Sequence, residues 1–287
     1  MKNATKLSLS LTLGILTAIA GCSGSGGSGG GSGVSLGGLI GGKYGQAVDA
    51  GTTFFSAENI TDSDEDQMGR TVAIAATNRW PLFDKPELTK YVTLVGLTLA
   101  EQTSKQDGWV FGVLDTPELG AYSGPNGYVM ITRGAIAAME DESELAGVLA
   151  HEISHVVDHD GVEAVKAGRR AEAISKGLSA ADQRAQMFNQ LSGNLIEKIL
   201  TSGYSQSQET KADSKAVDLL IKAGYDPNGL TKFLKRLQQA KGGSAKPFST
   251  HPGTADRIAR ITAQIGSAKP GATNRDRFVK ETAVAKF

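Results

Sequence analysis

The residues that most directly indicate chemistry form the run His151-Glu152-Ile153-Ser154-His155. Side chains four residues apart lie side by side on a helix, so both imidazoles can bind one metal ion. Glu152 directly follows the first histidine, where it can accept a proton from a water molecule at the metal without displacing it. Two histidine ligands with an adjacent glutamate base are typical of zinc-dependent peptide hydrolysis.

The alternative interpretation is a chance histidine pair on a surface helix, and the surrounding sequence helps to decide. Apolar residues recur at intervals of three and four across residues 142–157, which predicts one amphipathic helix. The chain has only four histidines, at positions 151, 155, 159 and 251. His159 lies about 12 Å along a helix axis from His151, at 1.5 Å per residue. One straight helix therefore cannot bring both to the same ion.

A catalytic zinc ion needs a third protein ligand and an open position for water. Glu209 and Asp213 begin a later helical pattern and share one face of it, because they are four residues apart. We expect Glu209 to bind the metal and Asp213 to accept the N–H of a ligand imidazole, which fixes the tautomer of that ring. Taken alone, the two carboxylates would be interpreted as solvated groups on a helix surface.

The elements that must position these residues predict an α+β fold that is mainly helical. A small β-sheet is expected beside the helix that carries the histidine pair, in one domain covering residues 46–287. The early helical patterns lie at 62–76 and 86–102, the strand patterns at 109–114 and 128–132, and a turn at 124–127. Helical patterns then continue almost to the C-terminus.

The first 21 residues are typical of an export signal. Two lysines precede an apolar stretch at 7–20, which is shorter than the about 20 residues of a membrane span but suits a signal peptide. Cys22 is the only cysteine and follows Ile19-Ala20-Gly21, which resembles the lipobox of bacterial lipoproteins. We expect cleavage after residue 21 and a lipid on Cys22. An ordinary secretory signal with an incidental cysteine is the alternative.

Residues 22–45 are dominated by glycine and serine, a composition that forms flexible linkers. This segment would tether the domain to a membrane through the lipid on Cys22. Ser23 rather than aspartate follows the cysteine, which favours the outer membrane of the cell envelope, with the domain facing the periplasm. Lys+Arg and Asp+Glu both number 30. Because no basic excess is present, we expect no nucleic-acid partner.

Several segments carry a wider resemblance. They are residues 128–134, Glu144–Val156, Glu209–Asp213, Ser249-Thr250-His251-Pro252 and Arg257-Ile258. Together they resemble the HtpX-like gluzincin zinc peptidases, and most closely the bacterial lipoprotein members of that family, the LoiP type. The resemblance covers residues 60–265. It implies one Zn²⁺ per chain, with Glu152 as general base and three ligands: His151, His155 and Glu209.

The same resemblance implies further roles near the metal. His251 would approach from a loop and would stabilise the oxyanion or, in a resting state, cap the zinc. The alternative is a loop histidine beside a proline that starts a helix. Arg257 would support that loop or form a structural salt bridge.

The chain departs from the family pattern at Gly120-Ala121-Tyr122-Ser123, where members often carry Asn-Ala-Phe-Ala, and at Gln206, where they often carry arginine. We expect residues 121–123 to form an edge strand, and an extended polypeptide substrate to pair with it along Ala121, Tyr122 and Ser123. The expected reaction is endoproteolysis of unfolded or misassembled envelope proteins.

Two other functions compete with this one. An envelope assembly factor would keep the metal site but act by binding its clients, as a chaperone does. A structural zinc site would usually be closed by cysteine or histidine ligands, and the only cysteine is the expected lipid attachment site.

Overall fold

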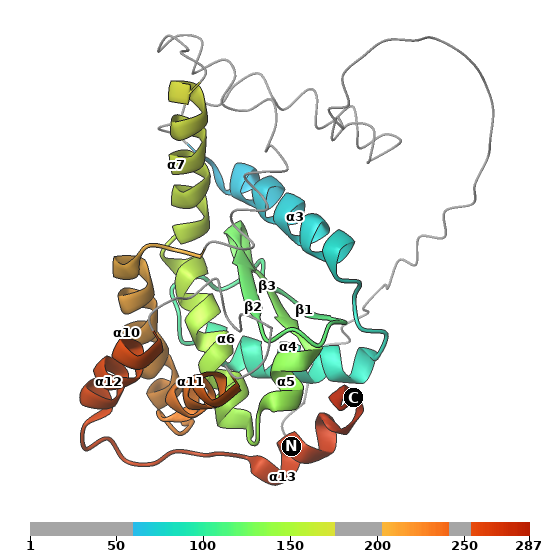
Figure 1. The fold of residues 1–287 in the computed structure, drawn as a ribbon, viewed down its shortest axis with the longest axis vertical. Coiled ribbons are helices and arrows are strands. Elements are labelled where there is room, and N and C mark those ends of the chain that lie inside the picture. Colours follow the sequence, from blue (N-terminus) through green and yellow to red (C-terminus); the bar gives the residue numbers. More distant parts are fainter. Residues whose placement is uncertain (1–59, 176–202, 241–253) are drawn as a thin grey trace, which may run out of the picture.

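The computed structural model describes residues 60–175, 203–240 and 254–287 (Figure 1). The expected signal peptide, Cys22, the tether and His251 lie outside these residues. Helices surround a small sheet, which confirms the α+β fold expected from the sequence. Among the described helices, none combines the length and apolar character that crossing a membrane requires.

Within the described residues the sheet has three strands, in the order β1-β3-β2. β1 (Val110–Leu114) pairs in parallel with the central strand β3 (Tyr128–Thr132), and β2 (Ala121–Gly124) pairs antiparallel with β3. The strands predicted at 109–114 and 128–132 are present as β1 and β3. The edge strand expected at residues 121–123 is present as β2, which pairs on one side only within the described sheet.

Helices cover both faces of this sheet. Side chains of β3 alternate between them, because successive residues of a strand point to opposite faces. Val129 and Ile131 belong to the main core with α6, whereas Met130 packs with Val72 and Trp80 of the α3 side. The helices are α3 (Asp62–Arg79), α4 (Pro86–Ala100), α5 (Arg133–Ala138), α6 (Glu142–Val157), α7 (Asp160–Ser175), α10 (Gln206–Lys222), α11 (Gly229–Ala240), α12 (Thr254–Ile265) and α13 (Arg275–Glu281).

Helix α6 is the central element of the fold. It packs against α4, α10, α11 and β2, and nearly all of its residues are buried. The approach of α11 is close: a Cβ atom on Gly147 would lie 2.4 Å from the backbone nitrogen of Leu230. Glycine therefore lets α11 lie directly against α6. The side chain of Asp141 caps α6 by accepting from the backbone N–H of Glu144.

A buried carboxylate ties the start of α6 to the rest of the molecule. Glu142 accepts hydrogen bonds from the hydroxyls of Tyr91 at 2.7 Å and Tyr225 at 2.8 Å. Asn274 donates to it at 3.0 Å and Arg277 donates from both Nε and Nη2. The C-terminal segment thus holds the N-terminus of the helix that carries the histidine pair.

Candidate metal centre

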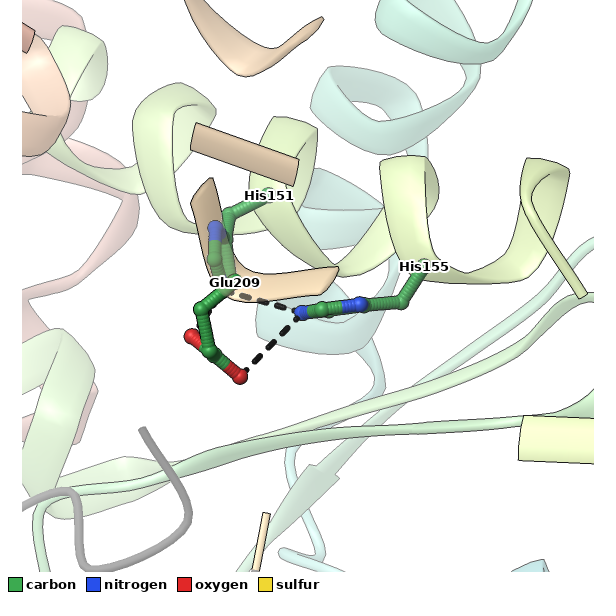
Figure 2. Close-up of side chains that lie close together, drawn as sticks. All are labelled: His151, His155 and Glu209. Atoms are coloured by element: carbon green, nitrogen blue, oxygen red, sulfur yellow. Dashed lines mark hydrogen bonds and ion pairs between the residues drawn. The ribbon is translucent and has the colours of Figure 1, made fainter. Parts of the chain in front are cut away.

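The structure brings His151, His155 and Glu209 together (Figure 2). The two Nε2 atoms of the imidazoles lie 3.1 Å apart. The Glu209 carboxylate lies 3.4 Å from Nε2 of His151 and 3.6 Å from Nε2 of His155. One ligand atom from each of the three residues lies within 4.8 Å of the others, and all three side chains are buried. Such a set can converge on one metal ion.

Two helices that are distant in sequence provide these side chains. His151 and His155 lie on α6, and Glu209 lies in the first turn of α10, which packs against α6. The start of α10 is fixed by a capping box between Ser205 and Gln208. The cap places Glu209 directly after it, on the face of the helix that is turned toward the two imidazoles.

Each imidazole is held by a second carboxylate. Nδ1 of His151 lies 3.1 Å from Oδ1 of Asp213, and Nδ1 of His155 lies 2.7 Å from Oδ2 of Asp160. With Nδ1 bonded to a carboxylate, each ring turns Nε2 toward Glu209, which is how ligand imidazoles are commonly oriented. The sequence placed Asp213 in this position. It did not identify Asp160, which lies at the start of α7.

Arg257 extends the network behind Asp213. Its side chain, only 1% exposed, donates from Nη2 to Oδ1 of Asp213 at 2.7 Å and from Nε to Oδ2 at 2.9 Å. Burial opposes ionisation of Asp213, but the hydrogen bonds from His151 and Arg257 outweigh it and lower the pKa to about 2. Arg257 therefore forms a bidentate salt bridge. The loop with His251, which it was expected to support, lies outside the described residues.

The charges of the site favour a cation. Burial and the Arg257 charge lower the pKa of His151, but Asp213 and Glu209 outweigh them and leave the pKa above its ordinary value. The carboxylates thus stabilise positive charge at this point, and a divalent ion can supply it in place of a proton. Two imidazole nitrogens and one carboxylate oxygen are a donor set that suits zinc.

Glu152 and the strand residues lie next to this centre. Glu152 is fully buried and accepts a hydrogen bond from the Ser123 hydroxyl at 2.8 Å. Ala121 and Ser123 are buried, and strand alternation places them on one face of β2. Tyr122 projects to the other face and stacks on Trp80 with ring centroids 5.3 Å apart. Of the three expected strand residues, the structure therefore brings Ser123 into contact with the glutamate.

His159 takes no part in the centre. The residue adopts a left-handed conformation with φ of 56°, and its imidazole lies 2.8 Å from a carboxylate oxygen of Glu65, largely exposed. This position agrees with the argument from helix geometry that His159 cannot reach the ion bound by His151.

The family model of peptidase family M48 matches residues 87–265, which is more than half of the chain. The chain therefore belongs to peptidase family M48. The family membership inferred from its motifs is confirmed.

Several relatives carry protease names. The beta-barrel assembly-enhancing protease of Escherichia coli (strain K12) is 28% identical over 234 residues, which are 77% of this chain and 47% of that protein. The metalloprotease YcaL of the same organism is 31% identical over 55% of this chain and 63% of its own length. The metalloprotease LoiP, also from that strain, is 28% identical over 71% of this chain and 78% of its own length. The chain thus spans about half the length of the first relative.

Proposed function

We propose that this chain is a zinc-dependent endopeptidase of the bacterial cell envelope that hydrolyses unfolded or misassembled proteins. The observation that carries the proposal is the buried convergence of His151, His155 and Glu209, with Glu152 beside them. These residues match in type and arrangement the ligands and the general base of zinc peptidases. Membership of family M48 supports the reaction class.

The residues divide the chemistry among them. When bound, zinc acts as a Lewis acid that lowers the pKa of water to about 7 and polarises the scissile carbonyl. Glu152 takes the proton of the attacking water and passes it to the leaving amine. Asp213 and Asp160 keep the ligand imidazoles in the tautomer that presents Nε2. His251, which lies outside the described residues, would stabilise the negative charge that develops on the carbonyl oxygen.

The substrate would bind as an extended chain along β2. This strand lies at the edge of the sheet and packs against α6, the helix that carries Glu152. A polypeptide that adds to such an edge gains main-chain hydrogen bonds whatever its sequence. Such binding suits unfolded proteins, because only an unfolded segment can present an extended backbone.

The proposed location follows from the N-terminal sequence. Residues 1–21 would direct export, Cys22 would carry a lipid, and residues 22–45 would tether the catalytic domain of residues 46–287 to the outer membrane, facing the periplasm. The name of the relative that enhances β-barrel assembly suggests envelope proteins as the substrates. Palmitate labelling of the wild-type chain and of Cys22→Ala in a Gram-negative host tests the anchor: we expect label only on the wild type.

Hydrolysis of casein by the full-length chain, purified in detergent, tests the proposed activity. We expect cleavage that stops with a zinc chelator, returns with added zinc, and is absent in Glu152→Gln although that variant still binds zinc. Cleavage that persists in Glu152→Gln or in chelator would point to a contaminating protease. A wild-type protein that binds zinc and cleaves nothing would contradict the proposal.

The second candidate is an assembly factor that binds its clients without cutting them. The name of the β-barrel assembly-enhancing relative favours this role as an addition to proteolysis. Glu152→Ala distinguishes the two roles in cells that lack the wild-type gene. If envelope function is retained while casein hydrolysis is lost, binding is the essential role; if both are lost, proteolysis is.

A further inference from the structure

Ser123 links the edge strand to the glutamate of the metal centre. Its hydroxyl donates to Oε2 of Glu152 at 2.8 Å, and the two residues come from different elements, β2 and α6. Ser123 is 6% exposed and Glu152 is 0% exposed. Water therefore competes little for this hydrogen bond, and hydrogen bonds in such low-dielectric surroundings are stronger than those in water.

The backbone of Ser123 is fixed from the other side. The hydroxyl of Tyr204, in the segment before α10, donates to the carbonyl oxygen of Ser123 at 3.2 Å. Burial, with the nearby charge of Glu152, raises the pKa of Tyr204, so its hydroxyl keeps its proton near neutral pH. The Tyr204 ring also lies 4.2 Å from that of His155, between centroids. Ser123 is thus held at a defined position relative to a metal-binding imidazole.

A glutamate side chain has three rotatable bonds, and its carboxylate works as a base only in orientations that face the attacking water. A general base acts when its accepting atom lies within about 2.6–3.2 Å of the heavy atom that carries the proton. A donor on Oε2 restricts rotation of the carboxylate. Ser123 belongs to the strand along which the substrate would lie. Its hydrogen bond therefore fixes the position of the Glu152 carboxylate relative to the substrate backbone.

We propose that Ser123 is a positioning residue for the general base: its hydroxyl holds the Glu152 carboxylate in the orientation that accepts the proton of the attacking water. This inference rests on the proposed peptidase function. Ser123 keeps its own proton throughout, since the proton taken up by Glu152 leaves with the amine. Replacement of Ser123 by alanine removes the hydroxyl that donates to Glu152 and adds no new atoms to the packing of β2 on α6.

The test compares Ser123→Ala and Ser123→Thr with the wild type in the full-length chain, on a fluorogenic peptide. Ser143→Ala is the matched control, because the buried Ser143 hydroxyl also donates to a carboxylate, that of Asp141, at the far end of α6. We expect Ser123→Ala to lower kcat about 10-fold, part of the roughly 100- to 10,000-fold that a general base contributes. KM should stay within about twofold, because the strand that binds substrate is unchanged. Threonine retains a hydroxyl and should restore kcat, and Ser143→Ala should leave it unchanged.

Two measurements without catalysis separate positioning from a structural role. Zinc affinity, measured by competition with a chromophoric chelator, should be the same in Ser123→Ala and the wild type. Crystal structures of both without metal should show the Glu152 carboxylate rotated only in the variant.

A Ser123→Ala enzyme with the kcat of the wild type would overturn the inference while the peptidase activity stands. Loss of zinc affinity or of thermal stability together with activity would also overturn it, because Ser123 would then be structural. A wild-type enzyme no more active than Glu152→Gln would instead contradict the proposed function itself, and the role of Ser123 with it.

Discussion

Nδ1 of His155 lies 2.7 Å from Oδ2 of Asp160, and both side chains are buried. α6 ends at Val157, the left-handed conformation of His159 turns the chain, and α7 begins at Asp160. The other carboxylate oxygen of Asp160 accepts from Gln208 of α10 at 2.8 Å. One carboxylate therefore fixes a ligand imidazole and links the helix of the histidine pair to the helix of Glu209.

Asp160→Asn should weaken zinc binding by about 10- to 100-fold, the usual effect of losing a carboxylate behind a ligand imidazole. Asparagine keeps the size of the side chain but removes the charge that orients Nδ1–H of His155. Chelator competition on the purified protein measures the affinity. Asp158→Asn is the control, because Asp158 pairs with Lys211 and Lys215 rather than with an imidazole. Equal affinities in Asp160→Asn and Asp158→Asn would refute this role.

Glu209→Gln should lower zinc affinity by more than the about 10- to 100-fold that loss of a carboxylate behind a ligand costs. Catalytic zinc sites depend on three protein ligands, and a neutral amide is a poor replacement for the carboxylate. Glu152→Gln is the matched comparison. It removes another buried carboxylate next to a ligand, but one that is not expected to bind the metal. Metal analysis after dialysis should find zinc in Glu152→Gln and little in Glu209→Gln. Zinc in Glu209→Gln but not in Glu152→Gln would show that Glu152, and not Glu209, is the metal ligand.

Glu142→Gln should destabilise the fold by roughly 2 kcal/mol near neutral pH, because an amide cannot accept all the hydrogen bonds that reach the carboxylate. Burial alone would raise the pKa of Glu142, but the hydrogen bonds, above all that from Arg277, outweigh it and lower the pKa. A lowered pKa means that the stabilisation is complete above the ordinary value of 4.5 and is lost as pH falls through the lowered one.

Urea unfolding of the wild type and Glu142→Gln at several pH values measures how the stabilisation by the Glu142 carboxylate depends on pH. The difference in unfolding free energy should be constant from neutral pH down to about 5 and should shrink in stronger acid. A difference that grows with acidity would show that the carboxylate is protonated in the folded protein.

Gly147→Ala should destabilise the protein by about 1–3 kcal/mol, the usual effect of overpacking a core. The new methyl group would lie 2.4 Å from the backbone nitrogen of Leu230, so α6 and α11 would have to separate. Gly124→Ala is the control, because its nearest neighbours would lie at an ordinary 3.5 Å. Thermal unfolding should show a clear drop in Tm for Gly147→Ala alone. Similar Tm values for both variants would mean that α6 and α11 can separate at Gly147 with little loss of stability.

The parts of the site that follow from local periodicity could be predicted from the sequence. His151 and His155 face one point because they are four residues apart on a helix, and Glu209 and Asp213 share a face for the same reason. The helix bounds followed from apolar spacing, so α6 was predicted at 142–157 and is found at Glu142–Val157.

Contacts that depend on how elements pack could not be predicted in this way. Asp160 reaches His155 only because the chain adopts a left-handed turn at His159, a conformation that no spacing rule predicts for histidine. The Ser123 hydroxyl meets Glu152 across the packing of β2 on α6, and Arg277 meets Glu142 from a helix 135 residues further along the chain. In each of these contacts, the separation of the two residues along the sequence follows no helix or strand spacing and does not predict that they meet.

Anomalous diffraction at the zinc absorption edge, from crystals of the full-length chain grown with zinc, tests the metal centre most directly. We expect one strong peak at the meeting point of the Nε2 atoms of His151 and His155 and the carboxylate of Glu209. A crystal that holds zinc elsewhere but shows no peak there, or shows a peak that the Glu209 carboxylate does not contact, would contradict it.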